Sequence, residues 1–270
     1  MSNKIHVDEK WFYMTKKKEN YYLLLDEGEP HRTCKSKNFV DKVMFLAAVA
    51  RPRFDAEGNV TFSGKLGIWP FVTKEPAKRS SVNRPAGTLE TKAMTSVGRD
   101  VIRSFYINKL LKAIREKWPR EDYGKSICIQ QDNARTHIDP DDPEFCQAAA
   151  QEGFNIYVRC QPPNSPDLNV LDLGFFNAIQ SLRYKESPKT VDELVSAVEK
   201  AYEDFSPISS NHIFLTLQQV MVEIMKVRGD NNYKISHMNK ARLQREGRLP
   251  CQLSCDNQLV ENTLAWLNTM

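Results

Sequence analysis

The sequence has few features that would place the protein in a membrane or outside the cell. It contains no run of about 18 apolar residues, so no membrane-spanning helix and no membrane partner are expected. Its first residues, MSNKIHVDEKWF, lack the apolar segment of a signal peptide, so secretion is not expected. The six cysteines follow no disulfide framework and are predicted to be free thiols. Cys251 and Cys255, with His237 upstream, lack a fourth ligand at a recognisable spacing, so a zinc site is not expected.

A strong excess of one charge is also missing. The chain has 38 Lys and Arg against 34 Asp and Glu, and its net charge of +4 fits both nucleic-acid-binding proteins and many enzymes. Two local clusters are more basic, namely Lys16, Lys17 and Lys18, and then Lys74, Lys78, Arg79 and Arg84. Each cluster could contact DNA phosphates or could belong to a solvated surface.

The apolar pattern of the first half predicts an antiparallel meander. We expect strands at 5–14, 21–25, 42–51 and 65–72, of which the third is a near-continuous apolar run typical of a buried central strand. The segment Thr73–Gly98 is interpreted mostly as an insertion loop. A loop of that length is rarely an inert connection, so we expect it to contact DNA or a partner.

Helices and strands alternate in the second half. The expected elements are a helix from about Asp100 to Pro119, strands at 126–130 and 155–160 with a helix at 143–152 between them, and helices beginning near Thr190 and spanning 210–228. This order after a meander predicts an α/β domain with a mixed central sheet, helices on its faces and further C-terminal helices. Residues 231–270 are expected to form a weakly structured tail with a possible short helix at 258–267.

Three aspartates fall where strands end or helices begin. Asp8 lies in the first strand, Asp132 follows an apolar strand, and Asp172 follows a Pro-rich run. Mg²⁺ prefers carboxylate oxygens, and two such ions can activate an attacking oxygen and stabilise a leaving one. Single aspartates often cap helices or fill turns, so the hypothesis of a metal site depends on all three together.

The segments VDEKWF, QQDNARTH and QPPNSPDLNVLD that carry these aspartates resemble the three catalytic blocks of mariner-type transposases. The 39 residues between Asp132 and Asp172 are similar to the interval of the plant mariner-like subgroup. The resemblance runs from about residue 5 to residue 228. It implies a ribonuclease H-like fold and makes Asp8, Asp132 and Asp172 the catalytic residues and the ligands of Mg²⁺, for which Mn²⁺ can substitute.

The resemblance also implies an activity. Such an enzyme cuts DNA at the ends of a mobile element and uses the freed 3′-hydroxyl to attack target DNA, with a preference for TA. It further implies DNA as the partner, a possible homodimer and a nuclear location. Residues 1–230 would form the catalytic domain. Because the chain begins close to the first catalytic strand, the N-terminal helix-turn-helix region of these transposases is expected to be absent from it.

Several roles stay open from the residues alone. Asn133, Arg135 and His137 could contact the scissile phosphate or hold the turn after the strand, whereas His6 is interpreted as a packed histidine. Besides a transposase, the chain could be a domesticated DNA-binding or scaffold protein, or a ribonuclease H-like nuclease with another substrate. The complete set of three aspartates and the interval between the last two favour the transposase.

Overall fold

The computed structural model describes residues 1–14, 26–27, 40–82, 84–186 and 188–269. The strand predicted at 21–25 and the cluster of Lys16, Lys17 and Lys18 lie outside these residues. Within the described ranges, no helix is long and apolar enough to cross a membrane.

A mixed sheet of five strands forms the centre of the fold. Its order is β5-β2-β1-β8-β9, with β2 antiparallel to β1 and β5, and β8 parallel to β1 and β9. These strands are β1 (Lys4–Tyr13), β2 (Lys42–Ala50), β5 (Lys65–Pro70), β8 (Ser126–Gln131) and β9 (Asn155–Cys160). The strands predicted in these regions are therefore confirmed. The apolar run in β2 is buried, as expected for a strand between two neighbours.

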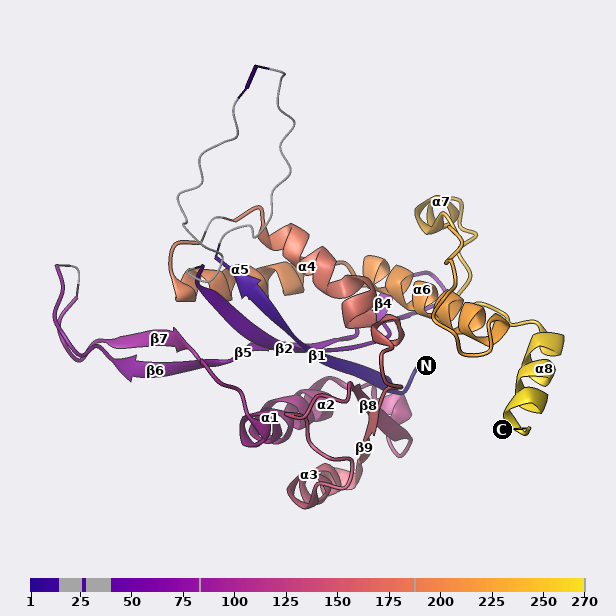
Figure 1. Ribbon diagram of the computed structural model, residues 1–270, viewed down its shortest axis with the longest axis horizontal. Helices are drawn as coiled ribbons and strands as arrows, with labels where there is room; N and C mark the ends of the chain where they lie inside the picture. Colours follow the sequence, from indigo (N-terminus) through magenta and orange to yellow (C-terminus); the bar gives the residue numbers. More distant parts are fainter. Residues whose placement is uncertain (15–25, 28–39, 83, 187, 270) are drawn as a thin grey trace.

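Helices cover both faces of the sheet (Figure 1). On one face lies a continuous helix made of α1 (Arg99–Phe105), η2 (Tyr106–Leu111) and α2 (Lys112–Lys117), together with α3 (Pro143–Ala149). On the other lie α4 (Phe176–Arg183), α5 (Val191–Asp204) and α6 (Pro207–Lys226). Each face has its own cluster of buried apolar side chains. The result is the layered α/β domain that the sequence predicts.

A capping box begins α5, the helix predicted to start near Thr190. The hydroxyl of Thr190 accepts a hydrogen bond from the backbone N–H of Glu193 at 3.2 Å, and the Glu193 carboxylate accepts one from the N–H of Lys189 at 2.7 Å. Further along α5, the buried hydroxyl of Tyr202 donates to the carbonyl of Ala48 at 3.0 Å, which attaches the helix to the middle of β2.

The segment Thr73–Gly98, expected to be mostly loop, instead contains a hairpin. Its strands are β6 (Val72–Pro76) and β7 (Leu89–Ala93), which pair antiparallel with each other alone and extend away from the main sheet (Figure 1). Since most of these side chains are not buried, the segment lacks the alternation of apolar residues by which strands are recognised.

Shorter elements complete the described chain. They are the small pair β3 (Arg53–Phe54) and β4 (Val60–Phe62), and the single turns η3 (Arg120–Asp122), η4 (Gln151–Gly153), η5 (Pro166–Leu168) and η6 (Leu171–Phe175). The C-terminal residues form α7 (Lys240–Arg245) and α8 (Asn257–Leu267), and the latter confirms the short helix predicted at 258–267.

Gly64, just before β5, is expected to be important for stability. Its φ of +76° favours glycine, and a Cβ there would lie 2.2 Å from the carbonyl oxygen of Ala50. Gly58 has a similar φ of +87°, but a Cβ there would meet nothing within 4 Å. We expect Gly64→Ala to lower the free energy of unfolding by about 2–4 kcal/mol and Gly58→Ala by about 1 kcal/mol. Thermal unfolding of both variants measures the difference, and equal losses would contradict the clash.

Candidate active site

The parallel pairing of β1 with β8 brings the first two sequence blocks together. His6 lies opposite Gln130 in this register, and two further residues along both strands place Asp8 beside Asp132. Neighbouring strands lie about 4.8 Å apart, so Asp8, in the middle of β1, lies next to Asp132, which directly follows the last residue of β8. Parallel pairing achieves this because β1 continues in the same direction past the end of β8.

Buried amide side chains attach the third block to this pair of strands. The fully buried Asn169 donates from its Nδ2 to Oδ2 of Asp8 at 3.2 Å and to the carbonyl of Val7 at 3.4 Å. From β8, Nε2 of Gln130 donates to the carbonyl of Leu168 at 2.9 Å. These bonds join segments distant in sequence and place Asp172, in η6, close to Asp8.

Asp172 lies close enough to Asp8 to affect the pKa of that carboxyl. Burial, the charge of Asp172 and the charge of Glu9 together raise the pKa of Asp8 to about 8, against the effect of a hydrogen bond from the Glu9 N–H. A hydrogen bond between the two aspartate side chains also favours the protonated form of Asp8. Two facing carboxylates of this kind need a proton or a cation between them at neutral pH.

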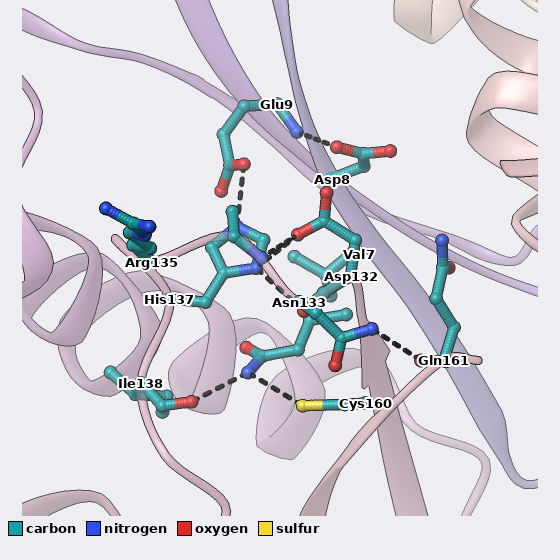
Figure 2. Close-up of polar contacts among 12 residues, drawn as sticks. Val7, Asp8, Glu9, Asp132, Asn133, Arg135, His137, Ile138, Cys160 and Gln161 are labelled. Atoms are coloured by element: carbon teal, nitrogen blue, oxygen red, sulfur yellow. Dashed lines mark hydrogen bonds and ion pairs between the residues drawn. The ribbon is translucent and has the colours of Figure 1, made fainter. Parts of the chain in front are cut away.

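His137 connects the second block to the first. Figure 2 shows its ring between Glu9 and Asp132, with Nε2 2.9 Å from Oε2 of Glu9 and Nδ1 2.8 Å from Oδ1 of Asp132. Burial opposes the charged form, but the hydrogen bonds and negative charges of these two partners raise the pKa of His137 to about 9. Oδ1 of Asp132 also accepts from the N–H of Ala134 at 2.8 Å. One oxygen of Asp132 is therefore held by two groups, and the other has no such contact with the residues that the structure describes.

The remaining candidates from the sequence lie in different surroundings. Asn133 donates to the carbonyl of Gln161 at 2.8 Å and so holds the turn after β8. The exposed side chain of Arg135 points away from the hydrogen-bonded group in Figure 2. Lys78 and Arg79 are exposed on the β6–β7 hairpin, which the fold does not bring to the aspartates. His6 is packed as expected, with its ring 5.7 Å from that of Phe214.

Sequence reasoning passed over three side chains that organise this group, namely Glu9, Gln130 and Asn169. Polar residues inside an otherwise apolar strand would have been a signal for Gln130, since buried polar groups need partners. Asn169 and Glu9 carry no comparable signal, because their partners become apparent only when the strands are paired.

The donor set fits a hard divalent cation in an open site. In the part of the chain that the structure describes, no three Asp, Glu, His or Cys side chains form a closed metal-binding group. Mg²⁺ does not require one, because it is usually held by one or two carboxylates and completes its octahedron with water and substrate phosphates. Asp8 and Asp172 supply the facing carboxylates, and the less constrained oxygen of Asp132 lies beside them.

Comparisons with known proteins identify structural relatives only. No family model and no curated protein matches the chain. Solved structures of the Mos1 mariner transposase do match. The strand transfer complex has a TM-score of 0.57 at 16% identity, covering 86% of this chain and 56% of that one. The paired end complex with Mn has a TM-score of 0.56 at 16% identity, covering 86% of this chain and 57% of that one.

The isolated catalytic domain of the same transposase is covered more completely. Its TM-score is 0.54 at 13% identity, over 86% of this chain and 85% of that domain. The chain thus spans little more than half of the full-length transposase but most of its catalytic domain. At identities this low, structural similarity shows the fold alone. It confirms the ribonuclease H-like fold that the sequence blocks imply. The chain has the fold of the mariner transposase catalytic domain.

Proposed function

We propose that this chain is the catalytic domain of a mariner-type DNA transposase of the plant mariner-like subgroup, which cuts and joins DNA by metal-dependent phosphoryl transfer. The observation that carries the proposal is that aspartates from three separate sequence blocks approach one another, because Asp8 lies beside Asp132 in the register of β1 with β8 and its side chain interacts with that of Asp172. The similar solved structures include complexes with transposon ends and with Mg or Mn, which supports DNA and a divalent cation as the ligands here.

Each side chain has a proposed role in this chemistry. Asp8 and Asp172 would hold Mg²⁺, or Mn²⁺ in its place, with Asp132 as the third ligand. The bound cations would activate the attacking oxygen and stabilise the leaving oxygen. Asn169 orients Asp8 by donating to its Oδ2. Arg135, which is exposed and three positions after Asp132 in the chain, would contact a phosphate of the bound DNA.

Further properties belong to the same proposal. Target DNA would be joined at TA dinucleotides, the active form would be a homodimer, and the protein would act in the nucleus. Recognition of particular terminal repeats is not assigned to these residues, because the side chains at the candidate site offer ligands for metal and phosphate rather than for base edges.

Replacement of each aspartate tests the activity directly. Asp8→Asn, Asp132→Asn and Asp172→Asn should each lower Mn²⁺-dependent nicking of supercoiled DNA by at least about 100-fold, because each removes a ligand charge. Asp167→Asn is the matched control, since this aspartate lies in the same block, in η5, and should leave nicking unchanged. Full nicking by Asp132→Asn would show that Asp132 is not a catalytic ligand, whereas DNA binding without any nicking by the wild type would support a DNA-binding or scaffold protein.

The repulsion between Asp8 and Asp172 makes a prediction about stability without metal. The folded pKa of Asp8, about 8, exceeds its ordinary 3.8, so this group stabilises the fold at low pH and loses that contribution as pH rises to about 8. Asp172→Asn removes one source of the shift. At pH 9 in a chelator, the variant should exceed the wild type in free energy of unfolding by on the order of 1 kcal/mol.

The difference should shrink at pH 5, where Asp8 is protonated in both proteins. Added Mg²⁺ should then stabilise the wild type more than Asp172→Asn, because the variant has lost a ligand. Thermal unfolding of the wild type and of Asp172→Asn, at pH 5 and at pH 9 and with and without Mg²⁺, measures these differences in stability. A variant no more stable than the wild type at pH 9 would show that the two carboxylates do not oppose each other.

The contact between Glu9 and His137 makes a prediction about metal affinity. Glu9→Ala removes the partner of Nε2 and frees the imidazole that holds Asp132. Mn²⁺ affinity, measured by electron paramagnetic resonance, should fall by about 10–100-fold, the usual effect of losing the group that orients a ligand.

Two variants separate this effect from a general loss of structure. Glu9→Gln keeps an oxygen that can accept from Nε2, so it should recover most of the Mn²⁺ affinity. Tyr106→Phe removes a buried hydrogen bond of 3.0 Å to Gln131, the last residue of β8, without touching Asp132. It should lower the melting temperature and leave affinity unchanged. Wild-type affinity in Glu9→Ala would mean that His137 does not position Asp132.

A further inference from the structure

Positive charge is concentrated in residues 226–248, which we call the basic arm. This segment contains seven Lys and Arg residues against two Asp and Glu, a net charge of +5, whereas the whole chain carries +4. The rest of the chain is therefore slightly negative. The seven cations are Lys226, Arg228, Lys234, Lys240, Arg242, Arg245 and Arg248.

Several of these cations have no charge partner in the described part of the chain. Lys226 pairs with Glu223, and both Arg242 and Arg248 pair with Glu246. The side chains of Arg228, Lys234 and Arg245 are exposed and form no ion pair with any residue that the structure describes. Exposed, unpaired cations of this kind are suited to phosphate groups, because binding releases counterions from the nucleic acid.

Hydrogen bonds hold the arm against α6. Nε2 of His212 lies 2.7 Å from Oε1 of Gln244, and the side chain of Gln219 donates to the carbonyl of Ser236 at 3.1 Å and accepts from Nζ of Lys240 at 3.1 Å. Figure 1 shows α7 beside α6, at the opposite end of the molecule from the β6–β7 hairpin. The arm is thus attached along a helix at several points, which fixes its position relative to that helix.

The same helix packs behind the candidate active site. The ring of Phe214 lies 5.7 Å from that of His6, and a Cβ at Gly174 would lie 3.4 Å from Ile213. His6 and Gly174 are each two positions from a candidate metal ligand. A helix of 20 residues is about 30 Å long, which corresponds to about nine base pairs of duplex DNA. The points at which the arm is bonded to α6 therefore lie within about 30 Å of the site along this helix, a distance that one bound duplex can span.

We propose that the basic arm binds the phosphate backbone of duplex DNA beside the segment that reaches the aspartates, without reading its sequence. This inference rests on the proposed function, because the duplex bound by the arm would be the part of the DNA substrate that flanks the segment at the aspartates. A lipid surface fits the region less well. The neighbouring α8 carries the exposed Leu264 and Leu267 but only one charged residue, Glu261, and lacks the cations of helices that bind membranes.

The test compares two triple variants that remove equal charge. The first combines Arg228→Gln, Lys234→Gln and Arg245→Gln, and the control combines Lys112→Gln, Lys185→Gln and Lys189→Gln, which are exposed elsewhere. Fluorescence anisotropy in EDTA would measure the affinity of the full chain for unrelated duplexes over a range of salt. The arm variant should weaken binding to all duplexes and reduce the salt slope by about 2.7, or about 0.9 for each lost phosphate contact.

A charge-preserving variant separates charge from structure. Arg228→Lys, Lys234→Arg and Arg245→Lys together should retain wild-type affinity and slope. Equal weakening by the control triple, or an unchanged slope in the arm triple, would overturn the proposal. Tighter binding of anionic phospholipid vesicles than of DNA, lost in the arm triple, would also overturn it. EDTA removes the metal, so this binding assay does not depend on catalysis. If the protein fails to cleave DNA in a separate assay with metal, but the arm triple shows the expected change in salt slope, the proposed function is refuted and the proposal for the arm is not.

Discussion

The candidate site depends on the parallel pairing of β1 with β8. This pairing is the only reason that residues separated by more than a hundred positions lie side by side, with Asp8 beside Asp132. A shift of one residue in the register would turn one of the two side chains to the opposite face of the sheet, because successive side chains in a strand alternate. The buried cores on both faces oppose such a shift, since each requires its own set of apolar residues.

The site also has a cost in stability that the surrounding polar side chains reduce. Asp8 is largely removed from water and lies near two other carboxylates, which raises its pKa and disfavours the metal-free, fully charged state. Asn169 and the N–H of Glu9 donate hydrogen bonds to Asp8, while His137 brings positive charge between Glu9 and Asp132. Such local conflict is typical of functional sites, where groups are arranged for a ligand rather than for the empty protein.

The β6–β7 hairpin and the basic arm, at opposite ends of the molecule, differ in how they are connected to the candidate site. Among the described strands, β6 and β7 pair with each other and not with the main sheet, and the hairpin projects from the body (Figure 1). The basic arm is bonded to α6, and α6 packs against residues next to two candidate ligands. One helix therefore joins the arm to the surroundings of the site, whereas the base of the hairpin packs against the core through Val72 and Ala93.

Much of the architecture could be predicted from the sequence, because regular elements leave local patterns. The apolar run of β2, the capping box at Thr190 and the amphipathic helices follow from residues close together in the chain. The hairpin of β6 and β7 could not be predicted in this way, since its strands bury little and so have no apolar alternation. The three sequence blocks with their aspartates could also be recognised from the sequence, because each block is a short continuous segment and the three follow one another in the expected order.

The sequence by itself determined the elements, the identity of the candidate ligands and the excess of cations near the C-terminus. Only the tertiary structure decided which groups meet. The contact of Glu9 with His137, the bond from Asn169 to Asp8 and the attachment of the arm to α6 join residues distant in the chain. Their geometry depends on strand register and helix packing, which arise from the burial of the whole core and leave no signature at the individual residues.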